Sequence, residues 1–233
     1  MAKEVGMKII ARIRTDFPTK FGIPRQSGLI QNQAQIVFEP EYRNPEALRG
    51  IEGYSHLWLI WQFSEAVRED WSPTVRPPRL GGNKRMGVFA TRSPFRPNAI
   101  GLSSVQLEGV DWEAPNGPVL VVSGADLMDQ TPIFDIKPYL AFTDSHPEAR
   151  DGFAGDVKDN NLTVEDPKGF LSKIPGKSEE ICAILSQDPR PHYQNQPDRV
   201  YGLPFSEFEI KFSVKDNTLT VLSVENCKKK EKV

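Results

Sequence analysis

The chain has 233 residues, 38% of them hydrophobic, and a formal net charge of −2 at pH 7. This is enough apolar material for one large domain, or for a core domain with a small companion. The slightly acidic balance argues against a protein that binds polyanions over its whole surface. Any affinity for nucleic acid must therefore be local.

The two cysteines, Cys182 and Cys227, lie far apart and outside any Cys-x-x-Cys or Cys/His cluster. This spacing argues against a disulfide scaffold and against structural zinc, and with three histidines in the chain we expect no metal site. The start of the chain, MAKEVGMKIIARIRTDF, has charges on both sides of a short apolar run. We therefore expect no signal peptide, no membrane segment and a cytoplasmic location.

Twenty prolines and 17 glycines separate short apolar runs, a pattern typical of a mainly-β chain. Most runs are too short to alternate with crossover helices, so a parallel doubly wound sheet is not expected. One short helix is expected from Asn44 to Arg49, where Asn44 can cap and Pro45 fits the first turn. We predict strands over Met7 to Ile13, Gln35 to Phe38, His56 to Phe63, Gly87 to Thr91, Ile100 to Val110, Val119 to Gly124 and Pro132 to Ile136.

The apolar run from His56 to Phe63 contains three residues that invite a functional interpretation. His56 fits a hydrogen-bonded core histidine better than a catalytic one. Trp58 and Trp61 fall on opposite faces of a strand, so we expect at least one of them to be core packing.

The most distinctive segment is a basic ribbon, VRPPRLGGNKRMGVFATRSPFRPNAIGL, which contains no Asp or Glu and which we define as Val75 to Leu102. The planar fork of arginine matches phosphate and carboxylate oxygens, and proline-stiffened loops hold such side chains ready at small entropic cost. One interpretation is a preformed anion site. The alternative is a surface loop whose arginines pair with acidic neighbours such as Glu65, Glu69 and Asp70. Gly81 and Gly82 resemble a phosphate-binding loop only loosely, because the P-loop spacing is missing.

Carboxylates are concentrated in Gly124 to Asp135 (GADLMDQTPIFD). They can bind amino groups, ribose hydroxyls or metals, but Asp is also an ordinary turn former.

From about Ser145 the chain becomes polar and acidic, and we predict a linker or long loop over residues 146–175. It would separate a domain of residues 1–145 from a small α+β domain of residues 176–233. In the second domain we predict a helix from Ser178 to Gln187, capped by Ser178, with one apolar face formed by Ile181, Ile184 and Leu185. A hairpin is predicted from Glu207 to Val214 and Thr218 to Val224.

Five segments occur in a specific order: FGIPRQSGL (Phe21 to Leu29), EALRGIEGYSHLWLIW (Glu46 to Trp61), VRPPRLGGNKRMGVFATRSPFRPNAIGLSSV (Val75 to Val105), DLMDQTPIFDIKPY (Asp126 to Tyr139) and QDPRPHY (Gln187 to Tyr193). Together they span nearly the whole chain and resemble the TrmO family, also called TsaA-like or YaeB-like. The run RPPRLGGNKRMGVFATRSPFRPN is long and unusual, which makes the resemblance specific.

The resemblance implies an S-adenosyl-L-methionine-dependent tRNA methyltransferase with an antiparallel β-barrel core. It further implies a homodimer with the cofactor near the subunit interface. The reaction would methylate N6 of N6-threonylcarbamoyladenosine at position 37 of tRNA. A barrel methyltransferase needs no GxGxxG motif, and none follows a predicted strand here. The basic ribbon would then serve the RNA and the carboxylate of the cofactor.

The same resemblance implies roles for individual residues. Arg25 or Arg92 would bind the cofactor carboxylate, and Asp126 or Asp129 would help to remove the N6 proton. The whole cofactor set is Pro24, Arg25, Gln26, Ser64, Glu65, Arg92, Leu102, Asp126, Leu127, Met128 and Asp129. The candidates for RNA binding or for shaping the site are Arg76, Arg79, Arg85, Arg96, Asn98, Asp135, Lys137 and Tyr139.

The chain departs from the family pattern at three places. Phe63-Ser64-Glu65 stands where the family has Phe-His-Gln, Ala99 replaces a proline, and Gln130 replaces a glycine. The missing histidine falls on the cofactor side of the family site. It leaves open an alternative function, a tRNA- or nucleotide-binding regulator on the same scaffold with weak or absent transfer activity.

Overall fold

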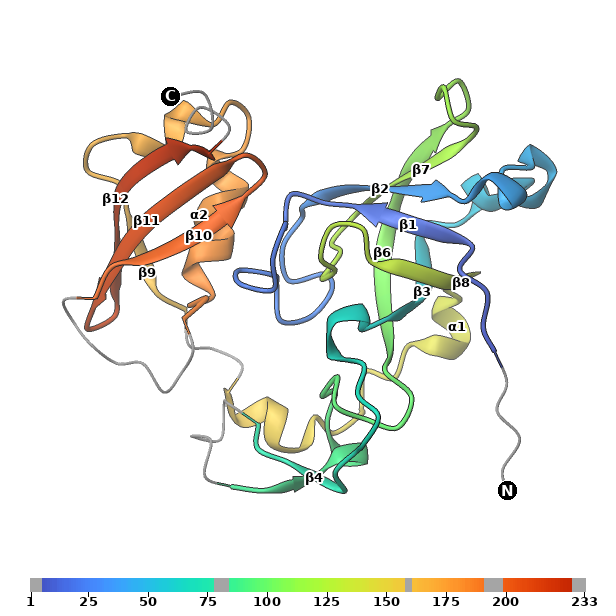
Figure 1. Ribbon diagram of the computed structural model, residues 1–233, viewed down its shortest axis with the longest axis horizontal. Helices are drawn as coiled ribbons and strands as arrows, with labels where there is room; N and C mark the ends of the chain where they lie inside the picture. The colour runs from blue at the N-terminus through green and yellow to red at the C-terminus, as the bar shows by residue number, and fades with distance from the viewer. Residues whose placement is uncertain (1–5, 78–83, 158–160, 191–198, 228–233) are drawn as a thin grey trace.

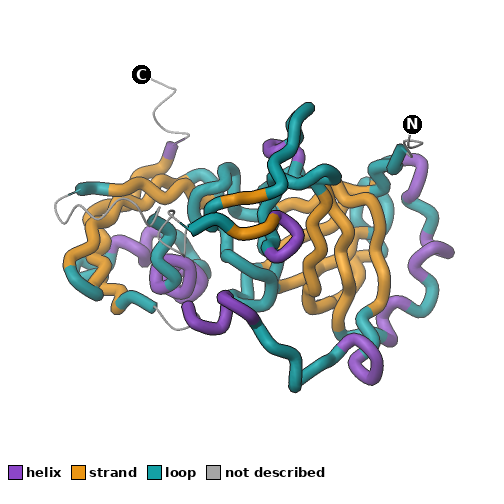
Figure 2. The backbone as a smooth tube through the Cα atoms, turned by 90° about the horizontal axis from the view of Figure 1, so that it is seen from below, coloured by secondary structure: helices purple, strands orange, loops and turns teal. Residues whose placement is uncertain are grey.

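The computed structural model describes residues 6–77, 84–157, 161–190 and 199–227. Apart from one short two-stranded sheet, its strands gather into two groups that lie side by side, as Figures 1 and 2 show. The larger group comes from the first part of the chain, and the smaller group from the C-terminal part. The fold is therefore mainly β, with most neighbouring strands antiparallel.

The first sheet closes on itself. It contains β1 (Ala11–Arg14), β2 (Gln33–Phe38), β3 (His56–Gln62), β6 (Ile100–Asp111), β7 (Val119–Ser123) and β8 (Pro132–Pro138). Its strands follow the order β1-β2-β7-β6-β3-β8, and β1 pairs with β2 on one side and with β8 on the other, so the sheet forms a closed ring. We call it the ring sheet.

Strict alternation of side chains fills the inside of the ring sheet. In β3, Leu57, Leu59 and Trp61 are buried, whereas the residues between them are more exposed. Successive side chains of a strand point to opposite faces, so a period of two separates core from surface. This phase also turns His56 outward. The expected core histidine is therefore wrong: His56 is exposed and bonds to the Ser55 hydroxyl through Nδ1 at 3.0 Å.

The C-terminal unit consists of a second sheet and one helix. The strands β10 (Tyr201–Phe205), β11 (Phe208–Lys215) and β12 (Thr218–Asn226) are antiparallel, and β9 (Thr163–Glu165) pairs parallel with β12. The helix α2 (Ser178–Ser186) buries Ile181, Ile184 and Leu185, as its apolar spacing predicts. The predicted hairpin is confirmed by the pairing of β11 with β12.

Short elements lie in the connections between the longer strands. The strands β4 (Thr74–Val75) and β5 (Met86–Gly87) pair with each other, and α1 (Ala141–Asp144) is a single turn. The 3-10 helices are Pro40–Tyr42, Pro45–Leu48, Ile51–Gly53, Ser64–Ala66, Val88–Ala90, Gly152–Val157 and Phe170–Lys173.

Three predictions about local elements can be compared with the structure, and they differ in how well it bears them out. The helix expected near Asn44 is present as a 3-10 turn, and the Asn44 side chain accepts the Glu46 N–H at 3.0 Å, as a cap does. The strand expected from Gly87 to Thr91 is wrong, because the chain leaves β5 at Gly87 and enters a 3-10 helix. Ser178 does not cap α2, since its hydroxyl donates instead to the carbonyl of Leu171 at 3.2 Å.

The segment predicted as a linker, residues 146–175, ends inside the core of the C-terminal unit. Leu162, Leu171 and Ile174 are buried in that core, and β9 belongs to its sheet. Polar residues between these positions hide the pattern in the sequence.

The connection between β1 and β2, which we call the β1–β2 loop (residues 15–32), ties the two sheets together. It reaches toward the C-terminal unit in Figure 1 and buries Phe17 and Ile30 in that unit's core. The Asp16 carbonyl accepts the Ser206 N–H at 2.7 Å, and its carboxylate lies 2.9 Å from Lys177 Nζ. Lys177 also pairs with Glu180 at 2.8 Å.

Candidate active site

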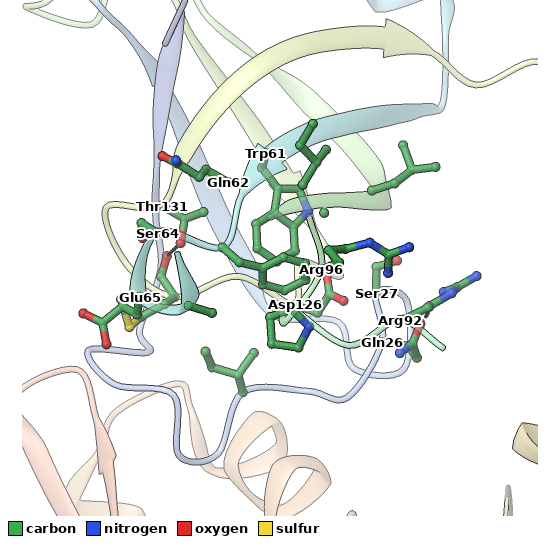
Figure 3. A pocket seen from close by; sticks show the side chains of 18 of the residues that line it. Gln26, Ser27, Trp61, Gln62, Ser64, Glu65, Arg92, Arg96, Asp126 and Thr131 are labelled. Carbon is green, nitrogen blue, oxygen red and sulfur yellow. Dashed lines mark hydrogen bonds between the residues drawn. The ribbon is translucent and has the colours of Figure 1, made fainter. Parts of the chain in front are cut away.

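A cavity of about 900 Å³ lies where the β1–β2 loop, the end of β3, the basic ribbon and the segment after β7 meet. This volume falls within the range of sites for small organic ligands. In Figure 3, Arg92 and Gln26 lie together on one side, Ser64 and Glu65 on the opposite side, and Trp61 and Asp126 between them. We call this space the central cavity.

Asp126 is the most unusual group in the central cavity. Its Oδ1 accepts a hydrogen bond from the Ser103 hydroxyl at 2.6 Å, and Ser103 in turn accepts one from Trp61 Nε1 at 2.9 Å. Burial raises the pKa of Asp126, although the hydrogen bonds from Ser103 and from backbone groups and the charge of Arg92 act in the opposite direction. A carboxylate held in this way is suited to a ligand that brings a positive charge or hydroxyl donors.

The backbone before Asp126 is fixed by the β1–β2 loop. Gly124 has φ +81°, a left-handed conformation that suits glycine, and its carbonyl accepts the Gly28 N–H at 2.9 Å. The buried Asn32 donates through Nδ2 to the Ala125 carbonyl at 2.9 Å. These bonds hold the carboxylate of Asp126 at the cavity wall.

Aromatic rings form a second wall. The Trp61 and Phe63 ring centroids are 4.2 Å apart and the rings are tilted by 60°. Gly101 of β6 pairs with Trp61 of β3, and a Cβ at Gly101 would overlap the indole ring. Glycine is therefore required at this position if the indole is to lie flat against the strand.

The basic ribbon supplies the cationic side of the central cavity. Arg92 Nη1 donates to Gln26 Oε1, and Arg96 donates to the carbonyls of Thr91 at 3.1 Å and Ser93 at 3.4 Å. Over the stretches that the structure describes, none of Arg76, Arg85, Arg92 and Arg96 forms an ion pair with Glu65, Glu69 or Asp70. Glu65 pairs instead with Lys20 at 3.4 Å. The interpretation of the ribbon as an ion-paired surface loop is thus not supported in the part described.

Most of the predicted cofactor set lines the central cavity. The residues that do so are Pro24, Arg25, Gln26, Ser64, Glu65, Arg92, Leu102, Asp126 and Met128. Leu127 does not, because it points away from its neighbours into the core of the ring sheet. Asp129 does not line the cavity either, since its Oδ1 accepts the Thr15 backbone N–H at 3.1 Å. Of the two carboxylates predicted for proton removal, only Asp126 reaches the cavity.

The predicted RNA-binding or site-shaping residues are dispersed. Arg96 and Asn98 line the central cavity, whereas Arg76 and Arg85 lie exposed beside β4 and β5. Arg79 lies outside the described residues. On β8, Asp135 and Lys137 pair with each other at 3.0 Å. Tyr139 packs against Trp58, a cavity-lining residue, with ring centroids 5.4 Å apart.

Two further features are absent from the described ranges. These ranges contain no group of three or more His, Cys, Asp or Glu side chains that could hold a metal ion. Within the same ranges, no helix has both the length and the apolar character needed to cross a membrane.

The fold and the central cavity define a mainly-β protein with a cavity of ligand size, lined by both carboxylate and guanidinium groups. Family profiles identify its relatives: the profile described as tRNA-methyltransferase O N-terminal domain matches residues 12–145, and that of the TrmO C-terminal domain matches residues 169–227. The chain belongs to the tRNA-methyltransferase O family, which confirms the resemblance seen in the sequence.

Individual relatives cover most of the chain. It is 38% identical over 226 residues to the tRNA (adenine(37)-N6)-methyltransferase of Escherichia coli (strain K12), covering 93% of this chain and 96% of that one. An enzyme of the same name from Eikenella corrodens is 44% identical over 173 residues, covering 73% of this chain and 97% of that one. A crystal structure of TrmO from P. aeruginosa superposes with a TM-score of 0.79 at 33% identity, covering 97% of this chain and 99% of that one.

Proposed function

We propose that this protein is an S-adenosyl-L-methionine-dependent methyltransferase that methylates N6 of the adenine at position 37 of tRNA. The observation that carries the proposal is the central cavity, with a partly buried carboxylate, an aromatic wall and arginines, in a chain whose N-terminal and C-terminal parts both match the TrmO family. The alternative of an inactive regulator is not favoured, because relatives that align with most of the chain are named as methyltransferases.

The residues of the central cavity fit S-adenosyl-L-methionine by the chemistry of their donors. Arg25 and Arg92 offer guanidinium groups for the carboxylate of the methionine part. Asp126 offers an acceptor for its ammonium group or for ribose hydroxyls. Trp61 and Phe63 offer apolar ring faces. When bound, the cofactor supplies an electrophilic methyl group on its sulfonium.

The protein's own part in the reaction is alignment and proton handling. The adenine N6 lone pair is delocalised into the ring, so holding the two reactants in line is the main contribution that the cavity can make. The aromatic wall excludes water from the place of transfer. Asp126, whose pKa burial raises, is the carboxylate that we assign to accept the N6 proton.

We propose N6-threonylcarbamoyladenosine as the form of the base that reacts. Its threonyl carboxylate is an anion next to N6, and Arg96 at the cavity wall is suited to receive it. The exposed Arg76 and Arg85 are assigned to the tRNA phosphates. The test compares tRNA from normal cells with tRNA from cells that cannot make this modification. Methylation of the first alone is expected, and equal methylation of both would reject the threonylcarbamoyl group as a requirement.

A pair of variants tests whether Arg92 binds the cofactor and Arg76 binds the tRNA. Arg92→Ala should weaken cofactor binding about ten- to a hundred-fold in calorimetry without tRNA, since one charge-assisted hydrogen bond contributes about 1.5 to 3 kcal/mol. Arg76→Ala should leave cofactor affinity unchanged and reduce the log-log salt slope of tRNA binding by about one unit. If both variants bind cofactor and tRNA like the parent, the assignment of the basic ribbon is wrong.

We further propose that the ring sheet is the antiparallel β-barrel expected of the family. We also propose that residues 1–145 and 176–233 act as domains joined through 146–175, the end of which packs into the second domain.

We propose in addition that the protein is a homodimer. Support for the dimer comes from apolar side chains around the central cavity: Phe89 is 72% exposed and Leu102 58%. A partner subunit would cover such a surface. Light scattering at micromolar concentration tests it, with a monomer as the contrary result. The cytoplasmic location stays a prediction.

A further inference from the structure

The QDPRPHY motif has no role in the site described so far. Its described part, Gln187 to Arg190, follows directly on α2, whereas His192 and Tyr193 lie outside the described residues. We propose that Asp188 and Arg190 form a clamp that positions Arg25 in the central cavity, so that the C-terminal unit completes the cofactor site. This inference rests on the proposed function of that cavity.

The clamp is a rigid corner. Asp188 has φ +51°, a left-handed conformation that glycine adopts freely and that Asp tolerates better than most residues, and Pro189 prevents the helix from continuing. Arg190 holds the Asp188 carboxylate with two parallel hydrogen bonds, from Nε to Oδ1 at 2.8 Å and from Nη2 to Oδ2 at 2.9 Å. Both side chains are largely buried, at 10% and 15% exposure. A bidentate pair of this kind fixes geometry as well as charge.

At this corner the backbone carbonyl of Asp188 faces Arg25, which lines the central cavity. The Asp188 carbonyl accepts a hydrogen bond from Arg25 Nη2 at 2.7 Å. Asp188 lies beyond the last residue of α2, and its carbonyl is a backbone acceptor for the guanidinium of Arg25. The clamp acts through a backbone atom whose direction depends on the left-handed conformation of Asp188, and the Arg190 pair stabilises that conformation.

Arg25 is connected through Gln26 to Arg92, the other arginine of the proposed carboxylate site. Gln26 Nε2 donates to the Arg25 carbonyl at 2.6 Å, and Gln26 Oε1 accepts from Arg92. One continuous line of hydrogen bonds therefore runs from the C-terminal unit to two arginines that line the central cavity. An arginine that is already held in place loses less conformational entropy when it binds an anion, so its affinity for that anion rises.

A second contact between the C-terminal unit and the β1–β2 loop serves as a comparison. Lys177 of the C-terminal unit pairs with Asp16 of the β1–β2 loop at 2.9 Å, and neither residue lines the central cavity. A purely structural contact of this kind should change stability when it is broken, but not cofactor affinity. The clamp differs because its partner Arg25 is itself a lining residue.

The test is a double-mutant cycle on the full chain with Arg190→Lys and Arg25→Ala, read by calorimetric titration with S-adenosyl-L-methionine and by Tm. Lysine keeps the charge of Arg190 but not its two parallel bonds, which makes it milder than truncation. We expect Arg190→Lys to weaken cofactor binding about five- to tenfold and Arg25→Ala about ten- to a hundred-fold. The double variant should bind no more weakly than Arg25→Ala alone.

Two results would overturn the clamp. One is an unchanged cofactor affinity of Arg190→Lys, and the other is a double variant whose loss equals the product of the two single losses. Lys177→Met is the control, with a lower Tm and parental cofactor affinity. If the parent chain binds no S-adenosyl-L-methionine, the proposed function itself fails and the clamp has no cofactor site to complete.

Discussion

Replacement of Asp126 by Asn separates the stability of the central cavity from its ligand affinity. Burial raises the pKa of Asp126 above 3.8, so the native state binds this proton more tightly than the unfolded chain does. The free energy of unfolding therefore falls as pH rises from 3.8 through the folded pKa, and at neutral pH the charged carboxylate destabilises the native state. Asp126→Asn removes that charge while the Ser103 hydroxyl can still donate to the amide oxygen.

The expected gain at pH 7 is about 1 kcal/mol, in the range of stabilising changes at functional sites. For a chain of this length it corresponds to about 2 to 4 °C in Tm. The gain should disappear below pH 3.8, where the carboxyl is neutral in both states. Cofactor affinity should fall about ten- to a hundred-fold, because a charge-assisted hydrogen bond is lost.

Scanning calorimetry between about pH 3 and 8 and titration with the cofactor measure the two effects. Asp111→Asn is the matched control, because this exposed carboxylate at the end of β6 accepts only the Glu113 N–H at 3.1 Å among the bonds described. It should change Tm by less than about 1 °C and leave cofactor affinity unchanged. A lower Tm of Asp126→Asn at pH 7 would show that the charged carboxylate does not destabilise the native state, and an unchanged cofactor affinity would show that Asp126 does not contact the cofactor.

Two further substitutions test the packing of Trp61 and the ion pairs of Lys177. Gly101→Ala should displace the Trp61 indole, lower the free energy of unfolding by about 1 to 3 kcal/mol and change tryptophan fluorescence, whereas Gly109→Ala on the same strand meets open space and should do neither. Lys177→Met should destabilise by about 1 to 3 kcal/mol by denaturant unfolding, well beyond the exposed control Lys173→Met. Burial alone would lower the pKa of Lys177, but its hydrogen bonds and acidic partners raise it above 10.5, so this loss should stay constant from about pH 6 to 9. A loss that disappears on going from pH 6 to 9 would contradict the ion-pair account.

The sequence allowed the strands of the ring sheet to be predicted where short apolar runs are bounded by turn residues. The run HLWLIWQ of β3 is an example, and the apolar face of α2 was predicted in the same local way from its helical spacing. The three-residue strand β9 escaped prediction, since it is too short for a pattern. Phe17 and Ile30 lie in a loop rich in proline and glycine, and nothing local shows that they complete the core of a distant unit.

The sequence predicted several of the residues that line the central cavity, but not which residues they form hydrogen bonds with. The family motifs pointed to Asp126, Arg92 and Gln26, yet the bond from Ser103 to Asp126 spans 23 residues and that from Arg92 to Gln26 spans 66. Such pairs depend on how the ring sheet closes and on the register of β3 against β6, which one sequence does not specify. Leu127 and Asp129 share the motif of Asp126 and point elsewhere for the same reason.

Methyl transfer to N6 of adenine 37 can be measured with labelled cofactor. The protein is incubated with methyl-labelled S-adenosyl-L-methionine and bulk tRNA, and the tRNA is then digested and its nucleosides are analysed by mass. We expect label in a nucleoside whose mass equals N6-threonylcarbamoyladenosine plus one methyl group, and little label with Asp126→Asn. Label in another nucleoside, or none with a parent chain that binds the cofactor, would contradict the proposed reaction.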